Sequence, residues 1–201
     1  PFEAESNGKL IWYNANTEKE AYQFFSNHNE YGSGVHYAQS FIESKINQEV
    51  SFRVGNGSAF KVFINDILVF ENIEDEITEL NAYRFNIQLP QGNNRILIKN
   101  AESNSESYFI VKLTDNNGNL LDNVSFSDIP SEYNKSTLQE LKPKIAENRF
   151  ELFFLNKIAK NPSDFFYKYC LFATYIRNSK YREAKELILP IYKKHPKSSL
   201  L

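Results

Sequence analysis

The residues that could act as a nucleophile or a metal ligand are few and lie far apart in the sequence. Cys170 is the only cysteine, and it stands in an apolar stretch of helical spacing. The three histidines, His28, His36 and His195, are not paired at the spacing of a metal site. Hydrolytic chemistry needs a nucleophile together with a base and an orienting group. The sequence therefore predicts a buried structural thiol, no catalytic residue and no metal site.

An acidic run offers a second kind of chemistry. Carboxylates crowd into one predicted loop at Glu71, Glu74, Asp75, Glu76 and Glu79. Glycoside hydrolysis needs two carboxylates at a fixed separation, which a solvated loop does not provide, so we expect no enzyme activity. Carboxylate and amide oxygens also suit calcium. A structural calcium ion in this loop or at residues 115–119 is the alternative, and no other cofactor is predicted.

Sugar binding is the ligand chemistry that the aromatic residues could support. A pyranose ring has an apolar face and a rim of hydroxyls, so its site needs an exposed aromatic platform and a few polar side chains. The candidates are Trp12, Tyr13, Tyr31, His36, Asn29 and Asn56. We expect both asparagines to lie in loops. The other interpretation of Trp12 and Tyr13 is that they cover the edge of a β-sandwich.

These side chains would be positioned by β-strands between residues 35 and 114. Apolar and polar residues alternate in seven stretches, at 35–44, 50–54, 60–64, 67–70, 83–89, 96–98 and 109–113. Asn, Asp, Gly and Pro fill the breaks, as is typical of half-buried antiparallel strands joined by turns. Asn65 and Asp66 fall where a tight two-residue hairpin turn would lie. The pattern predicts a β-sandwich over residues 1–128.

One short helix is predicted ahead of these strands. Thr17 and Glu20 match a capping box, and Ala21, Phe24 and Phe25 form one apolar face. The apolar run at residues 10–13 suits a strand or a segment lying across the mouth of the sandwich.

After Asp128 the apolar residues recur at helical spacing. Helices are predicted around residues 138–145, 152–158, 166–176 and 184–191. The separators at 161–162 and 178–179 are short, so we expect neighbouring helices to pack as antiparallel hairpins. Pro162 and Pro196 are 34 residues apart, which is the period of the tetratricopeptide repeat. The sequence predicts an all-α, tetratricopeptide-like segment of helical hairpins at 129–201.

The charge and the cysteine content of the chain exclude several classes of function. The 201 residues have a net charge of −2, and Lys and Arg are dispersed among the acids, so we expect neither a nucleic-acid nor a membrane partner. A single cysteine excludes an internal disulfide framework. The chain begins at Pro1 and contains no Met, from which we expect a piece of a longer product with further domains.

The front of the chain resembles the galactose-binding-like jelly rolls that are attached to bacterial glycoside hydrolases and other envelope proteins. The resemblance is carried by YAQSFIES, VSFRVGNGSAFKVFINDILVFEN, FNIQLPQGNNRILIKN and FIVKLTDNNGN, between residues 37 and 119. Asp66 stands where that family usually has Gly. A jelly roll followed by tetratricopeptide-like helices is similar to the N-terminal part of Bacteroidetes envelope proteins that carry a transglutaminase-like domain.

The resemblance implies a non-catalytic binding or scaffolding fragment of a larger bacterial envelope protein, in the periplasm or at the cell surface. Its partners would be other domains of the same polypeptide, or proteins bound by the helices. The alternative is a carbohydrate-binding module with a loop-borne aromatic platform for a glycan. An enzyme would need a cleft with paired titratable groups.

Overall fold

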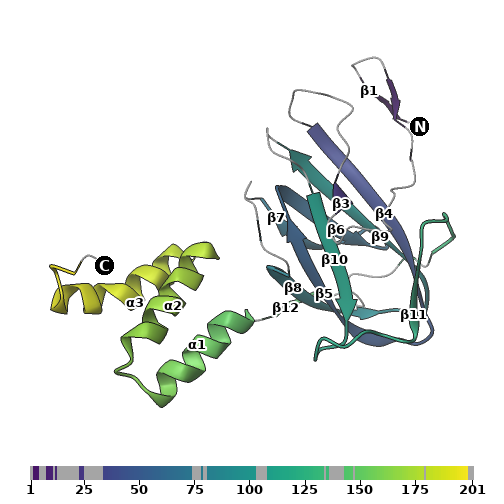
Figure 1. Cartoon of the computed structure of the whole chain (residues 1–201). Coiled ribbons are helices and arrows are strands. Elements are labelled where there is room, and N and C mark those ends of the chain that lie inside the picture. Colours follow the sequence, from purple (N-terminus) through teal and green to yellow (C-terminus); the bar gives the residue numbers. More distant parts are fainter. Residues whose placement is uncertain are drawn as a thin grey trace. The chain divides into compact units, whose positions relative to one another are not determined.

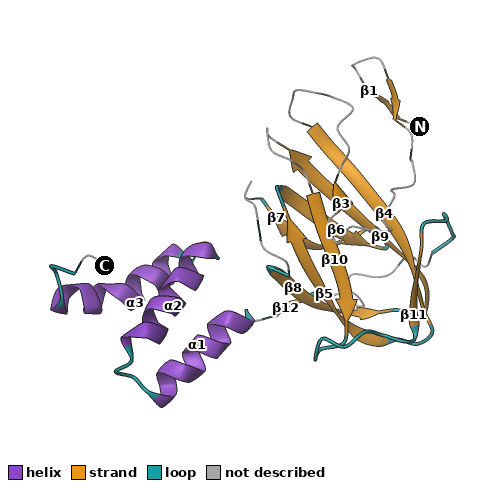
Figure 2. Ribbon diagram, viewed as in Figure 1, coloured by secondary structure: helices purple, strands orange, loops and turns teal. Residues whose placement is uncertain are grey.

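The structure is a computed structural model of the 201-residue chain. It describes residues 2–4, 8–10, 12, 23–24, 34–73, 78, 81–102, 108–133, 135, 143–146, 148–178 and 180–198. The chain divides into two compact units, Pro1–Ala146 and Glu147–Leu201. Figure 1 follows the chain through both units, and Figure 2 shows that the first is made of strands and the second of helices.

The first unit is built on two five-stranded antiparallel sheets. Their strand orders are β12-β8-β5-β10-β3 and β11-β4-β9-β6-β7, and a separate small sheet pairs β1 with β2. The strands are β1 (Phe2–Ala4), β2 (Gly8–Leu10), β3 (Gln23–Phe24), β4 (Gly34–Ser44), β5 (Gln48–Asn56), β6 (Ala59–Ile64), β7 (Ile67–Asn72), β8 (Tyr83–Leu89), β9 (Gly92–Glu102), β10 (Tyr108–Thr114), β11 (Val124–Ser127) and β12 (Lys144–Ile145). The seven strands predicted from alternation correspond to β4 through β10.

The two sheets pack face to face around one hydrophobic core. Alternate residues of β5, β6, β8 and β9 point into it and are buried. Phe70 of one sheet stacks on Phe85 of the other, with ring centroids 5.1 Å apart, and Phe60 contacts Tyr83 across the same interface at 5.2 Å. The unit is therefore a β-sandwich, as the alternating pattern predicts.

The hairpin between β6 and β7 turns at the two residues expected from the sequence. Asn65 and Asp66 have φ values of 50° and 70°, the left-handed backbone that a two-residue hairpin turn of this kind requires. Asn65 is buried, and its side chain donates to Asn94 Oδ1 at 2.8 Å and accepts from the Arg95 amide at 2.8 Å. These bonds fasten the turn to β9 and hold Asp66 at the rim of the sheet.

Three sequence predictions for this unit need correction. Gln23 and Phe24 form β3 instead of part of a helix, because they pair with β10; the rest of that predicted helix is outside the described residues. Ile145 lies in β12, paired with Phe85 of β8, and not in a helix. The boundary between the units therefore follows Ala146, whose amide donates to Arg84 O, instead of Asp128.

The second unit contains helices α1 (Arg149–Lys160), α2 (Phe165–Arg177) and α3 (Tyr181–Lys194). They correspond to the last three predicted helices. The Asn148 side chain caps α1 by accepting from the Phe150 and Glu151 amides, and Asp164 caps α2 in the same way. Helix α2 packs against both α1 and α3. Among the described residues, no helix is long and apolar enough to cross a membrane.

Candidate functional site

The candidate site lies on the outer face of the sheet that contains β4. Alternate residues of this strand, from Tyr37 through Phe41 to Glu43, point away from the core. The strand register aligns Glu43 with Ser125 of β11 on one side and with Asn93 of β9 on the other. Polar side chains from three neighbouring strands are thus brought into one row, although they are far apart in the sequence.

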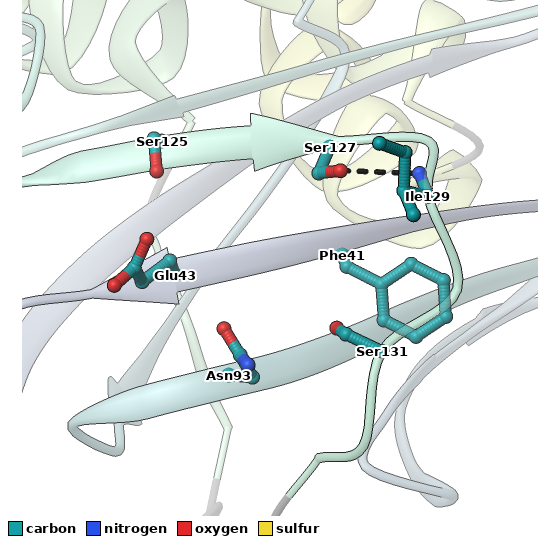
Figure 3. Close-up of a pocket in the computed structure, with 7 residues that line it drawn as sticks. All are labelled: Phe41, Glu43, Asn93, Ser125, Ser127, Ile129 and Ser131. Atoms are coloured by element: carbon teal, nitrogen blue, oxygen red, sulfur yellow. Dashed lines mark hydrogen bonds between the residues drawn. The ribbon is translucent and has the colours of Figure 1, made fainter.

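This row forms one wall of a pocket of about 270 Å³. The lining residues come from β4, β9, β11 and the segment after β11: Phe41, Glu43, Asn93, Ser125, Ser127, Ile129 and Ser131 (Figure 3). Glu43 and Asn93 are exposed at the sheet surface. The pocket combines three hydroxyls, an amide and a carboxylate with the apolar side chains of Phe41 and Ile129.

The wall opposite this row is the segment 128–133, which we call the strap. Tyr133 anchors its far end, because its hydroxyl donates to Asp66 Oδ2 at 2.8 Å. The other oxygen of Asp66 accepts from Arg95 Nη1 at 2.9 Å, and the Arg95 guanidinium lies 5.8 Å from the centre of the Tyr133 ring. This network explains why the hairpin turn carries Asp66: a Gly would make the turn but could not hold the strap.

The strap also covers an aromatic side chain on the outer face of the sheet. Phe41 belongs to the outward phase of β4, yet it is only 5% exposed. The Tyr133 ring lies 6.3 Å from it, centroid to centroid. At the near end, the Ile129 amide donates to Ser127 Oγ at 3.1 Å, which bends the chain back over the sheet. Val35 and Tyr37 lie on the same phase of β4 and are exposed, so the alternation in the sequence does not indicate that Phe41 is covered.

A second hollow, of about 310 Å³, lies beside the edge strand β7. Its lining is Leu68, Val69, Phe70, Glu71 and Ile145. Its described lining residues offer a polar ligand a single carboxylate and no hydroxyl or amide side chain. The first pocket, which we call the strap pocket, is therefore the better candidate for a site that recognises a specific small molecule.

None of the predicted sugar-binding residues that the structure describes, Trp12, His36 and Asn56, lines the strap pocket. Trp12 is 56% exposed and lies outside any described strand or helix, and Tyr13, Asn29 and Tyr31 are outside the described residues. His36 is half-buried on the inward phase of β4, the phase opposite Tyr37.

The prediction that Asn56 lies in a loop is wrong. It is the last residue of β5 and is fully buried. Its side-chain nitrogen donates to Asn100 Oδ1 at 2.8 Å and to Ser58 O. Its backbone N–H donates to the Thr78 hydroxyl, and its carbonyl accepts from the same hydroxyl. Asn56 is therefore part of the polar core at the end of the sandwich and cannot contact a ligand at the surface.

One of the two predicted calcium positions can be described. The Asp115 carboxylate accepts from the amides of Asn117 and Asn119 and from the Asn119 side chain, at 2.9, 2.7 and 2.8 Å. These bonds, the Asn119 side-chain bond first, lower the pKa of Asp115 below its usual value. Both carboxylate oxygens of Asp115 thus already accept hydrogen bonds that close the turn. Among the described residues no three His, Cys, Asp or Glu gather as a metal site; most of the loop at 71–80 is outside them.

Removing the Tyr133 hydroxyl should loosen the strap while the sandwich stays folded. We expect Tyr133→Phe to lose about 0.5–1.5 kcal/mol, the usual contribution of a hydrogen bond. The hydroxyl loses Asp66 and the long bond that it accepts from Arg95 Nη1 at 3.4 Å, but the Asp66 carboxylate keeps Arg95 as a partner. Amide hydrogen exchange of peptides covering 128–133 should become faster. Tyr37→Phe, at an exposed tyrosine on the same face, is the control. Equal exchange in both variants would show that the hydroxyl does not anchor the strap.

Comparisons with known proteins identify no family. No protein-family model and no curated protein matches the chain. Several solved structures are similar to parts of it. They include a β-glucosidase from Kluyveromyces marxianus in complex with glucose (8% identity, 47% of this chain, 12% of that chain, TM-score 0.39), a family 35 carbohydrate binding module from an environmental isolate (18%, 62%, 91%, 0.35) and the GH31 α-xylosidase from Xanthomonas citri (11%, 66%, 14%, 0.36).

The similarity to these structures does not reach a level that supports an argument about function. Every TM-score is below 0.5, and the chain spans only 12% and 14% of the two hydrolases. The activities and ligands in their names remain properties of those proteins.

Proposed function

We propose that this chain is a non-catalytic binding protein and that the strap pocket holds a sugar ring of a neutral glycan. The observation that carries the proposal is the convergence of Glu43, Asn93 and Ser125 from three strands beside the strap. Carboxylate, amide and hydroxyl groups together can accept and donate hydrogen bonds around a ring of hydroxyls. The apolar side chains of Phe41 and Ile129 suit the C–H face of the sugar.

The charge of the lining favours a neutral ligand over an acidic one. Glu43 is the only ionisable side chain among the lining residues that the structure describes, and its carboxylate would repel an anionic sugar. Arg95 lies on the same face, but its guanidinium is paired with Asp66. A phosphate or uronate would therefore meet an acid and no free cation among the lining residues.

The proposal also covers the type of β-sandwich, the type of helical unit and the larger protein to which the chain belongs. We infer that the sandwich is a jelly roll of the galactose-binding-like kind. The support is the strand order. One sheet contains the order β3-β10-β5-β8 and the other contains β4-β9-β6-β7, and these are the orders that two Greek keys produce when they pass between two sheets. We also propose that the helices are tetratricopeptide-like and that the chain is part of a larger bacterial envelope protein, in the periplasm or at the cell surface, related to those with a transglutaminase-like domain.

A glycan array followed by calorimetry with the bound glycan tests the sugar proposal. We expect the 201-residue chain to bind at least one neutral glycan. Glu43→Gln and Asn93→Ala should each weaken binding about tenfold, as expected when one hydrogen bond to the ligand is lost. Glu71→Gln, at an exposed glutamate of the same sheet that pairs with Lys61, is the matched control and should bind normally.

Four results would contradict the proposal. The first is the absence of any glycan ligand, and the second is normal binding by both pocket variants. If binding is lost in Trp12→Ala instead, the aromatic platform expected from the sequence is the site. Cleavage of the bound glycan by the chain would show that it is an enzyme.

A second candidate function is the binding of a protein partner by the helical unit. The observation that favours it is the amount of apolar surface that the three helices leave uncovered. Helices of a soluble unit usually bury such a surface against another element.

A further inference from the structure

The helical unit hides little of its apolar surface. Among its described residues only Leu171 and Ala184 are buried apolar side chains. In the same described part of the unit, eleven large apolar side chains are exposed, namely Phe150, Leu152, Phe153, Leu155, Phe165, Phe166, Tyr169, Ile176, Tyr181, Leu189 and Tyr192. Isolated helices of this length are marginal in water, and most of their stability comes from packing. A surface of this kind is typical of a protein interaction site.

Part of this surface is a continuous line of side chains on α2, which we call the α2 stripe. It consists of the exposed Phe165, Tyr169 and Ile176 and the half-buried Phe172, spaced by four, three and four residues, so all four lie on one face of the helix. The Tyr169 ring contacts the Phe165 ring at 6.1 Å and the Phe172 ring at 6.2 Å. Rows at this spacing form the ridges that fit between the side chains of another helix.

The charge around the α2 stripe is positive. Lys168 lies three residues after Phe165 and four before Phe172, so it borders the stripe. Helix α2 itself contains Lys168 and Arg177 and no Asp or Glu. Residues 147–201 carry 11 Lys and Arg against 5 Asp and Glu, a net charge of +6, whereas residues 1–146 carry 12 against 20, a net charge of −8. The net charge of −2 for the whole chain is the sum of these two opposite charges.

We propose that the α2 stripe binds an acidic amphipathic helix of a protein partner. The inference rests on the second proposed function and specifies the chemistry of the partner. Leu or similar side chains of that helix would pack against Phe165, Tyr169 and Ile176. Its acidic flanks would face Lys168 and the positive field of the unit, which favours encounter with an acidic surface.

The charge and the side chains argue against other occupants. A second copy of the helical unit would bring +6 against +6. Nucleic acid prefers flat aromatic platforms with open faces, but neighbouring rings of the stripe are tilted against one another by 35° and 41°, and the stripe ends in the aliphatic Ile176. A helix with apolar and acidic faces satisfies both the shape and the charge of the stripe.

Fluorescence anisotropy with labelled peptides of about 20 residues, long enough to form a helix on binding, tests the inference on the 201-residue chain. The first peptide has Leu on one helical face and Glu elsewhere. The second has Lys in place of every Glu, and the third is a scramble of the first with no apolar face. A labelled poly-dT strand is the nucleic-acid probe. We expect the first peptide to bind at least about tenfold more tightly than the others, and more weakly in high salt.

Variants locate the binding surface. The double variant Phe165→Ala/Tyr169→Ala should reduce affinity about tenfold or more, since buried aromatic anchors dominate interfaces, and Lys168→Glu should reduce it as well. Tyr181→Ala, at an exposed tyrosine of α3 outside the stripe, is the matched control. The helical circular dichroism of each variant checks its fold. If the double variant unfolds, Lys168→Glu decides the test.

The possible failures are distinguishable. If the acidic and basic peptides bind equally, protein binding stands but the acidic partner is wrong. If no peptide binds, both the second proposed function and this inference fall. Tighter binding of poly-dT, or a stable dimer of the chain that excludes the peptide, would overturn the choice of occupant.

Discussion

Phe85→Ala should lower the free energy of unfolding of the sandwich by about 3–5 kcal/mol, the usual cost of deleting a buried phenyl ring. Phe85 is fully buried on β8. Its ring lies directly opposite Phe52 in the strand register and stacks on it at 5.2 Å with parallel planes. On its other side it stacks on Phe70 of the facing sheet. One side chain thus connects the layers, and its removal leaves a cavity between them.

Hydrogen exchange measures this loss in the intact chain. The slowest amides of peptides covering β5 and β8 report global opening of the sandwich, and their protection should fall by the stated free energy. Phe126→Ala is the matched control, because Phe126 is 58% exposed on β11 and surface substitutions usually change stability by less than about 0.5 kcal/mol. Equal loss of protection in both variants would mean that Phe85 does not lie in a shared core.

The main strands and the last three helices could be predicted because their signals are local. Alternation with period two follows from the pleat of a half-buried strand, and helical spacing follows from 3.6 residues per turn. The turn at Asn65 and Asp66 could be predicted for the same reason, since its backbone requirement involves two adjacent residues. These patterns do not state which strands are neighbours.

The errors come from pairing between distant segments. Phe24 fits the apolar face of a helix, but its partner in β10 is Tyr108. Ile145 follows helical spacing, but β8 pairs with it as a strand. In both places long-range pairing overrides a weak local preference, which is the common outcome for short segments.

The candidate site was missed for a related reason. Glu43, Asn93 and Ser125 form a row only through the register of three strands, and single-residue chemistry does not reveal that row. Asn56 was misplaced because an asparagine between glycines is typical of a turn, whereas its burial depends on Asn100, 44 residues further along the chain. Phe41 shares its phase of β4 with Val35 and Tyr37, so alternation alone could not show that it points outward and is covered by the Tyr133 ring.

The second large effect on stability is expected when a buried carboxylate of the helical unit is removed. Glu151 on α1 is only 8% exposed. Its carboxylate accepts from Asn178 Nδ2 at 2.7 Å and from Lys180 Nζ at 2.6 Å, and these two residues are the first and last of the connection between α2 and α3. The Lys180 ammonium also lies 5.9 Å from the centre of the Tyr175 ring. Burial first, and then the nearby Glu151 charge, raises the pKa of Tyr175 above its usual value.

We expect Glu151→Ala to destabilise the helical unit by about 1–3 kcal/mol, because the partly buried amide and ammonium lose their acceptor. Glu151→Gln should cost less, since its amide oxygen can still accept from Asn178 while the charge opposite Lys180 is lost. Urea unfolding followed by helical circular dichroism gives both values. Glu186→Ala removes the same side chain from an exposed pair with Arg182, where the loss should stay within about 0.5 kcal/mol. If Glu151→Ala behaved like Glu186→Ala, the contact from α1 to the α2–α3 connection would contribute nothing to stability, and the helices would be held together by Leu171 and Ala184 with the partly buried apolar side chains around them.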